Sequence, residues 1–344
     1  MSESNRIEYI DALRGLTMLM VVMHHIVTYN YQGIYVFSWG QSFTIVQNPL
    51  FFFISGFFLY KDSECWNSRF AVNFLKKKFR VVLIPTLLFL TIYAYTGGWT
   101  LQGVIDSKWK AEYWFTYVLC IFYFIYAVLS VLMNTFRLRG GQKVCLLLLF
   151  GVCLTLMESL KMNAIVENHP FLKVLSLSEW KYFIFFVFGT VVKKYFNRFQ
   201  ALLDNDSFMA AILVTFIATL VLFQQMQFGI VGIKLKFVGY GVMGIIILFA
   251  YFRKHSSLFS CETKVGKLFI YVGKRTLDIY LLHFFFLTVH WRCIGQFFTD
   301  HPNSTVEFFI TLIFALMVIS LSLLMSSILR TSPTLASWLF GERA

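Results

Sequence analysis

The chain has 344 residues, of which 58% are hydrophobic, 19% are aromatic and only 14% are charged. Soluble domains average about half apolar and about a quarter charged residues, so this composition and a mean hydropathy of +0.69 indicate a polytopic membrane protein. A net charge of +13 would suggest nucleic-acid binding in a soluble protein, but no basic helix with interleaved aromatics stands outside the apolar stretches. We therefore expect the lipid bilayer as a partner and no nucleic acid.

Ten apolar stretches are long enough to cross a membrane, which takes about 17–25 residues in a helix. Their expected ranges are 9–28, 43–60, 79–96, 113–133, 143–160, 180–196, 208–226, 230–252, 268–290 and 305–329. The predicted fold class is all-α, a polytopic membrane protein with about ten transmembrane helices. The spans consume nearly the whole length, so we expect a single transmembrane domain over 1–344 and no appended soluble domain.

The distribution of basic residues predicts the orientation. If the N-terminus is cytoplasmic, the alternate loops on that side hold more than two-thirds of the 30 Lys and Arg residues. Both termini are therefore predicted to be cytoplasmic. The N-terminus is not expected to be a cleavable signal, because Glu3, Glu8 and Asp11 stand where a basic region would precede the apolar core.

The remaining composition argues against a metal or tightly bound cofactor. The six cysteines are scattered without a CxxC pair, and we expect them to be mostly small buried side chains. The histidines lack HxxxH or HExxH spacing, and no phosphate-binding glycine loop is present.

The first predicted span carries polar residues at both ends. It opens on Asp11 and Arg14 and closes on His24 and His25. At about 100° per residue, Arg14 lies near the face of Asp11, and eleven positions later His25 returns to within about 20° of Arg14 and about 16 Å along the axis. His24 points elsewhere. Charges inside a spanning helix mark a functional cavity by default, because they are costly in lipid.

Other interpretations of these residues remain open. Asp11 and Arg14 lie in the first turns and would also fit side chains that reach the cytoplasmic interface. His24 would fit a bystander that hydrogen-bonds a neighbouring helix. His25 lies deeper on the Arg14 stripe, where a neutral imidazole is the usual general base near neutral pH.

The segment "YIDALRGLTMLMVVMHHI" resembles the first helix of acyltransferase family 3. Members of this family are bacterial integral-membrane enzymes that move acyl groups, usually acetyl, onto sugars. The signature is a basic residue, ten intervening residues and a histidine, which Arg14 and His25 match.

Further segments carry the same resemblance. "NPLFFFISGFFL" is similar to the second-helix motif and contains Ser55. "FLKKKFRVVLIP" is similar to a basic-x-x-basic segment before a proline, with Lys77 and Arg80 as the pair and Lys where the family often has Arg. "EYWFTYVL" places Glu112, where many relatives have histidine, two residues before Trp114.

A late segment completes the resemblance, which covers most of the chain from about 7 to 290. "YVGKRTLDIYLLHFFF" is a close match to the family's late helix and contains Arg275, Tyr280 and His283. Asp278 falls on a different azimuth from His283, so we do not expect the two to pair within the helix.

The resemblance implies an O-acyltransferase of the bacterial cytoplasmic (inner) membrane that modifies a polysaccharide. Acyl-CoA, most often acetyl-CoA, would be a co-substrate rather than a bound cofactor, and a sugar or glycan hydroxyl would be the acceptor. His25 would be the general base or the acyl carrier. Arg14 would orient the donor or the oxyanion, and Asp11 would fix the Arg14 rotamer.

The remaining predicted site residues divide between donor and acceptor. Lys77, Arg80 and Arg275 would bind the CoA phosphates, although topology and anionic lipid also explain such a basic cluster. The expected cavity or acceptor residues are His283, Ser55, Tyr280, Glu112 and Trp114. Helix packing equally explains Ser55, a structural hydrogen bond equally explains His283, and the membrane interface is the simpler explanation of Glu112.

The alternative function is a transporter or exporter of a glycan or lipid-linked solute. Transporters also carry intramembrane charges, usually with inverted repeats or paired broken helices. This sequence shows neither repeat symmetry nor paired prolines at helix breaks among its five Pro. The two functions differ in whether Arg14 and His25 are needed for acyl-CoA turnover or for the flux of an unmodified solute.

Overall fold

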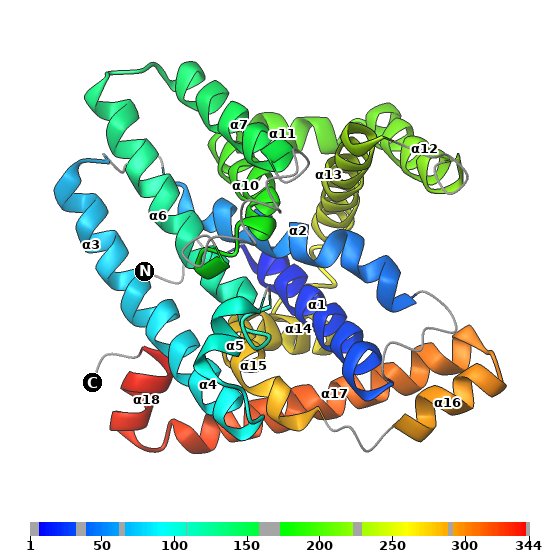
Figure 1. Cartoon of the computed structure of the whole chain (residues 1–344). Helices are drawn as coiled ribbons and strands as arrows, with labels where there is room; N and C mark the ends of the chain where they lie inside the picture. The colour runs from blue at the N-terminus through cyan, green and yellow to red at the C-terminus, as the bar shows by residue number, and fades with distance from the viewer. Residues whose placement is uncertain are drawn as a thin grey trace. The chain divides into compact units, whose positions relative to one another are not determined.

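The computed structural model describes residues 7–31, 39–61, 66–107, 109–157, 173–222, 229–287 and 292–341. The described residues are 85% helical and contain no strand, which confirms the all-α prediction (Figure 1). Helices satisfy every interior backbone hydrogen bond within one segment, which is what a chain in lipid requires.

The chain divides into two compact units. The first contains Met1–Ile54, Arg198–Gln227 and Phe237–Ile328, and the second contains Ser55–Asn197, Phe228–Lys236 and Leu329–Ala344. Each unit is described by itself below. The expectation of a single transmembrane domain stays a prediction.

The first unit holds the N-terminal helix and most of the C-terminal half. It begins with α1 (Glu8–His25) and the π-helix η2 (Ile26–Asn30), and it takes the first part of α2 (Trp39–Leu59). The later helices that lie wholly or mainly in it are α11 (Phe196–Leu203), α12 (Asp206–Leu222), α13 (Ile230–Lys254), α14 (Lys264–Lys274), α15 (Thr276–Leu282), the 3₁₀ helix η5 (His283–Phe286), α16 (Arg292–Asp300) and α17 (Ser304–Leu329).

The second unit is built from the middle of the chain and its C-terminal helix. Its elements are α3 (Ser68–Lys78), the π-helix η3 (Phe79–Leu83), α4 (Ile84–Thr96), α5 (Leu101–Asp106), α6 (Trp114–Thr135), α7 (Gly140–Met157), the 3₁₀ helix η4 (Leu177–Tyr182), α10 (Phe183–Lys194) and α18 (Pro333–Phe340). Within this unit α3 packs on α6, α7 packs on α10 and α18 packs on α4 (Figure 1).

Each of the ten expected spans overlaps a helix, but the count of ten is not confirmed. By length and composition, six helical segments of the described residues qualify as membrane spans, or seven if the pair Phe196–Leu203 and Asp206–Val221, bent by 77°, is one span. The six are Glu8–Asn30, Ser68–Thr96, Trp114–Thr135, Gly140–Met157, Gly232–Lys254 and Ser304–Leu329. Ile45–Leu59 and Thr276–Phe286 are shorter apolar helices.

Two boundaries differ from the expectation for local reasons. The third expected span begins well before residue 79, because the Asn67 side chain accepts a hydrogen bond from Phe70 N and starts the helix there. The ninth is broken at Arg275, which separates α14 from α15 with φ −111° and ψ 18°. The residues on either side of this break form part of the candidate active site.

Candidate active site

Two glycines bring the backbones of α1 and α14 into contact in the first unit. A Cβ atom on Gly15 would lie 2.1 Å from Phe269 O, and one on Gly273 would lie 1.8 Å from Asp11 O. Neither distance leaves room for a carbon atom, so glycine is required for this approach. The contact holds α14 along α1, and α15 follows after the break at Arg275 and also contacts α1.

The break supplies a partner for Arg14. Arg14 Nη2 donates to Thr276 Oγ1 at 2.9 Å, and Arg14 Nη1 lies 3.7 Å from Asp11 Oδ1. The Asp11 side chain is 1% exposed and that of Arg14 is 28% exposed. Because the Asp11 carboxylate is buried, it does not lie at the membrane interface. The structure therefore favours an Arg14 guanidinium that Asp11 and Thr276 hold from two sides over two side chains that extend to water.

A second arginine is held in a similar way at the same break. Asp278 is buried, and its Oδ2 accepts from Ser326 Oγ of α17 at 2.7 Å and from Arg275 Nη1 at 3.3 Å. These contacts agree with the azimuth argument that kept Asp278 apart from His283. Arg275 remains one-third exposed, at 33%.

At the other end of α1, the structure brings His25 and His283 together. His25 Nδ1 lies 2.8 Å from His283 Nε2, with the rings stacked at 12° and their centroids 5.0 Å apart. His283 Nδ1 lies 3.0 Å from Ile279 O and 2.9 Å from Tyr280 O. His283 is fully buried, whereas His25 is only partly buried.

Aromatic side chains surround this histidine pair. The Phe284 ring lies 3.9 Å from that of His283 and 5.0 Å from that of His25, measured between centroids. Tyr29 and Tyr280 lie at 5.8 Å from His25 and 5.9 Å from His283, respectively. The pair therefore sits in a largely apolar environment, where hydrogen bonds are stronger than in water.

Directly after His25, α1 widens into the π-helix η2. Tyr31 N donates to Ile26 O at 3.2 Å in the i→i+5 pattern, and the Tyr31 hydroxyl lies 3.2 Å from Thr311 Oγ1. Asn30 is fully buried, and neither polar atom of its side chain has a hydrogen-bond partner among the described residues. Buried amides are normally bonded, so Asn30 is an exception that the sequence did not indicate.

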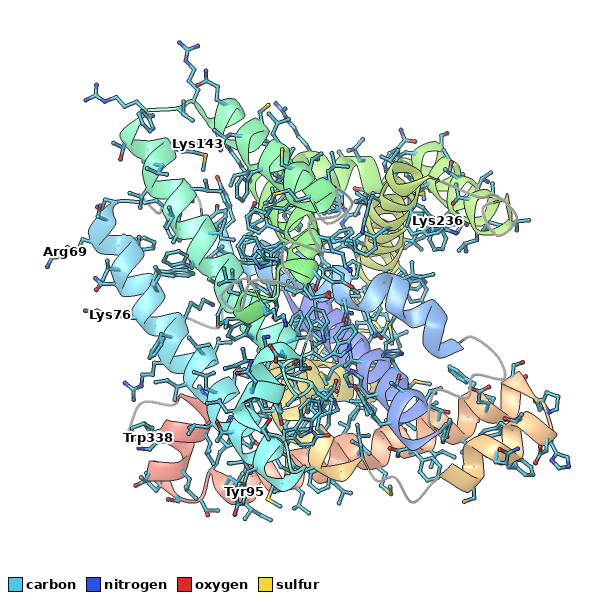
Figure 2. The ribbon with its side chains drawn as sticks, in the orientation of Figure 1. Arg69, Lys76, Tyr95, Lys143, Lys236 and Trp338 are labelled. Atoms are coloured by element: carbon cyan, nitrogen blue, oxygen red, sulfur yellow. The ribbon has the colours of Figure 1, made fainter. Side chains whose placement is uncertain are left out.

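In the second unit, the basic cluster lies where α3 passes into the π-helix η3. Lys77 and Arg80 are exposed, and Arg80 Nη2 donates to Ser337 Oγ of α18 at 3.2 Å. Lys78 instead points inward, with Nζ 4.2 Å from the Tyr123 ring centroid. Figure 2 shows Arg69 and Lys76 projecting from the side of α3 away from α6.

The "ISGF" segment of α2 packs closely within the second unit. A Cβ atom on Gly56 would lie 1.9 Å from Phe186 O of α10, so this glycine is required for the approach of the two helices. Ser55 beside it is half-buried. The contact supports the packing interpretation for Gly56 and leaves a substrate role for Ser55 as a prediction.

A strained turn precedes α6. Lys110, Ala111 and Glu112 have φ of 48°, 46° and 75°, in the left-handed region that costs about 1–3 kcal/mol per residue. Lys110 Nζ stabilises the turn by donating to Ile105 O at 2.6 Å, Ser107 O at 3.0 Å and Lys173 O at 2.9 Å. Burial lowers the pKa of the Lys110 ammonium below its ordinary value.

Trp114 follows this turn and is buried among aromatic rings. Its ring centroid lies 5.9 Å from that of Trp109 and 5.7 Å from that of Tyr182. Glu112 is partly exposed just before it. The buried Glu179, which the sequence did not single out, lies 3.8 Å from Lys181 in the same unit.

A comparison with protein families decides what these motifs belong to. The family model described as an acyltransferase domain, that of acyltransferase family 3, matches residues 7–326. The chain belongs to acyltransferase family 3. No curated protein and no solved structure matches it. The match covers nearly the whole chain and confirms the resemblance, and with the apolar helices it indicates a multi-pass membrane protein of an acyltransferase family.

In this acyltransferase, several predicted residues are brought together and several partners were missed. The first unit joins Asp11 with Arg14, and His25 with His283. The partners that the sequence did not indicate are Thr276 and Ser326. Thr276 follows Arg275 directly and so lay within a recognised motif, whereas nothing near Ser326 in the sequence links it to Asp278.

The cysteines of the acyltransferase correct one expectation. The five described cysteines are free, and Cys145, Cys153, Cys261 and Cys293 are exposed while Cys120 is half-buried. The expectation of mostly buried cysteines is therefore wrong for these four. Cys145 and Cys153 lie in the candidate span Gly140–Met157, where lipid is as apolar as a protein core and burial in protein is not needed. This reason does not apply to Cys261 and Cys293, which lie outside the candidate spans. The described residues contain no group of three His, Cys, Asp or Glu that could hold a metal ion.

Proposed function

We propose that this family member is an O-acyltransferase that moves an acetyl group from cytoplasmic acetyl-CoA to a hydroxyl of a cell-envelope sugar or glycan. Membership of the acyltransferase family supports the reaction class. The observation that carries the proposal is the 2.8 Å contact between His25 and His283, because it places an oriented, partly exposed imidazole on the signature helix.

The proposed chemistry needs only one proton acceptor. His25 takes the proton of the acceptor hydroxyl as its oxygen attacks the thioester carbonyl carbon. The C–S bond then breaks, and the CoA thiolate leaves with the proton returned by His25. In the second form of the reaction, His25 attacks the thioester carbonyl, the C–S bond breaks and CoA leaves as the thiolate. The acceptor oxygen then takes the acetyl group from His25, and the hydroxyl proton goes to the CoA thiolate.

Basic residues would hold the anionic donor. Arg14 remains charged and offers a planar fork, so in this proposal it orients the thioester or stabilises the oxyanion, with Asp11 and Thr276 fixing its rotamer. Lys77, Arg80 and Arg275 would bind the CoA phosphates. Their exposure supports this role, since a phosphate must reach them from water.

The proposed acceptor contacts are Ser55, Tyr280, Glu112 and Trp114. Aromatic faces and hydroxyl or carboxylate groups suit a sugar, which presents both apolar C–H surface and hydroxyls. The strained turn before α6 supports a role for Glu112 and Trp114, because left-handed backbone at non-glycine residues clusters at functional sites.

The proposal extends to the cellular setting. We infer a bacterial cytoplasmic membrane, ten spans and both termini in the cytoplasm, on the basis of the apolar stretches and the loop charges. A cytoplasmic donor would then meet an acceptor on the envelope side through the buried part of the site. Reporter fusions to the two termini test this orientation directly.

The test uses purified protein in lipid vesicles, supplied with acetyl-CoA and pooled envelope glycans. We expect the wild type to release CoA and to acetylate glycan, and His25→Ala to lose nearly all of both activities while it stays folded, with a melting temperature lower by only a few degrees. Loss of turnover in the variant together with loss of folding would be resolved by His25→Gln, which keeps the polarity of the position. Absence of CoA release from the wild type would overturn the proposal and favour export of a glycan or lipid-linked solute.

A further inference from the structure

The imidazole of His283 is fixed at both of its nitrogens. Its Nδ1 faces the carbonyl oxygens of Ile279 and Tyr280, one turn earlier in the same helix, at 3.0 and 2.9 Å. Its Nε2 faces His25 Nδ1 at 2.8 Å. Phe284 packs against the ring with the centroids 3.9 Å apart.

These contacts dictate where the protons lie. A carbonyl oxygen only accepts hydrogen bonds, so His283 Nδ1 must carry a proton. In a neutral imidazole the other nitrogen is then an acceptor, so His283 Nε2 must receive a proton from His25 Nδ1. A neutral His25 with its proton on Nδ1 bears its lone pair on Nε2.

We propose that His283 is a positioning residue that holds His25 in the Nδ1–H tautomer, so that His25 Nε2 is the atom that meets the acceptor hydroxyl or the acyl group. The inference rests on the proposed function for its chemistry, but the tautomer itself does not. His283 is fully buried and both of its nitrogens are engaged, so a positioning role fits it better than direct contact with the acceptor.

The hydrogen bond persists through the reaction. When His25 Nε2 takes the hydroxyl proton, the ring becomes a cation whose Nδ1–H still donates to His283 Nε2, now as a stronger, charge-assisted bond. The proton later leaves from Nε2 to the departing sulfur. His283 itself neither gains nor loses a proton in either step.

The membrane setting explains why a histidine suits this position. In soluble hydrolases a buried carboxylate commonly orients the catalytic histidine. A carboxylate deep in an apolar span carries a large desolvation cost, whereas a neutral imidazole bonded to carbonyls of its own helix carries little. The pair therefore obtains a defined tautomer without placing a resting charge in the apolar layer.

The kinetic test compares His283→Leu with His283→Gln. Leucine fills the space without an acceptor atom, while the glutamine side chain can place an amide oxygen near the position of Nε2. We expect His283→Leu to lower kcat at least about 100-fold, while its KM for acetyl-CoA stays within about two-fold of wild type. The kcat of His283→Gln should be at least about ten-fold higher than that of His283→Leu. A purely structural role predicts no such recovery.

A second measurement does not depend on turnover. Nitrogen-15 NMR of histidine-labelled protein reports which ring nitrogen carries the proton, with the His25 signal assigned by its loss in His25→Gln. We expect protonated Nδ1 and unprotonated Nε2 on His25 in the wild type, and a mixture of tautomers in His283→Leu.

The outcomes separate the two claims. A His25 with its proton on Nε2, or equal losses of kcat in the leucine and glutamine variants, would overturn the positioning role. If His25 shows the expected tautomer but the protein never consumes acetyl-CoA, the positioning role of His283 is supported and the proposed function is wrong. If His283→Leu does not fold, the glutamine variant and the wild-type spectrum still decide.

Discussion

The two ends of α1 carry polar side chains in different ways. Near its N-terminus, Asp11 and Arg14 are formally charged, and Arg14 also donates to the hydroxyl of Thr276. Near its C-terminus, the polar groups are the imidazoles of His25 and His283 and the amide of Asn30, all neutral in the arrangement inferred above. Both ends meet the same partner segment, because Arg14 contacts Thr276 directly after the break at Arg275 and His25 contacts His283 at the start of η5.

The difference follows from the cost of charge in an apolar medium. Arg14 keeps 28% of its side chain exposed, whereas His283 is fully buried. Water or a counter-ion can stabilise a charged side chain. Where neither reaches the side chain, a neutral hydrogen-bonded pair costs less free energy than a charge. The charged end is therefore suited to an anionic ligand and the neutral end to proton transfer.

The largest expected effect comes from removing the base at the neutral end. His25→Ala should lower kcat for acetyl transfer by about 10³-fold, because it removes the proposed general base. The measurement is CoA release under saturating donor. Because the buried Nε2 of His283 loses its partner, the melting temperature should also fall by a few degrees, with the protein still folded.

The matched control is the neighbouring histidine. His24 Nε2 lies 3.5 Å from Thr28 Oγ1, one turn later, and the His24 ring centroid lies 5.6 Å from that of His25. His24→Leu should leave kcat within about three-fold of wild type. A loss as large as that of His25→Ala would show that the catalytic assignment within the first helix is wrong.

The next substitution tests the close backbone contact between α1 and α14. Gly273→Ala would place a carbon 1.8 Å from Asp11 O, so α1 and α14 must separate and both polar ends lose their partners. Overpacking of this kind costs about 1–3 kcal/mol, which should lower the melting temperature by several degrees and reduce activity as well. Differential scanning fluorimetry and CoA release measure the two changes.

Gly239→Ala in α13 is the control for this substitution. The nearest atom to its new Cβ is the mobile Met243 Cε at 4.0 Å, and alanine is the better helix former. Its melting temperature should be unchanged or slightly higher. Equal destabilisation by both substitutions would argue that close approach at Gly273 is not what matters.

A smaller effect is expected from Arg14→Lys, which tests whether Arg14 acts through its positive charge alone or also through the planar shape of its guanidinium. Arg14→Lys keeps the positive charge but loses the fork that reaches Thr276 Oγ1 at 2.9 Å. We expect kcat/KM for acetyl-CoA to fall about ten-fold, with little change in stability. Arg69→Lys, at an exposed position of α3, should show no change and is the control (Figure 2).

The smallest expected effect is a gain in stability rather than a loss. Asn30 has a buried amide with no hydrogen-bond partner among the described residues, so Asn30→Leu should stabilise the ligand-free protein by about 1 kcal/mol. The melting temperature should rise by about 2 °C. Thr311→Val, which removes a hydroxyl bonded to Tyr31 at 3.2 Å, should lower it instead. A fall in both variants would mean that Asn30 is bonded to water or to a ligand.

Local patterns predicted a good part of this molecule. Each of the ten expected spans overlaps a helix, and the stripe of Asp11, Arg14 and His25 follows from helical periodicity alone. The break at Arg275 was not predicted, although it falls on the polar run of Lys274, Arg275 and Thr276, because the apolar residues on its two sides together have the length of one span. The two π-helices also escaped prediction, although each lies within or beside a family motif, after His25 and at Arg80.

The sequence by itself determined the membrane class and the family, and it predicted that Asp11, Arg14 and His25 share one face of α1, because these depend on composition, motifs and spacing within one helix. Only the tertiary structure decided their partners. Thr276 meets Arg14 and His283 meets His25 across more than 250 residues of chain, and Ser326 meets Asp278 from α17. The physical reason is that Gly15 and Gly273 let two backbones touch, and a contact of that kind sets which atoms face each other in a way that no local pattern contains.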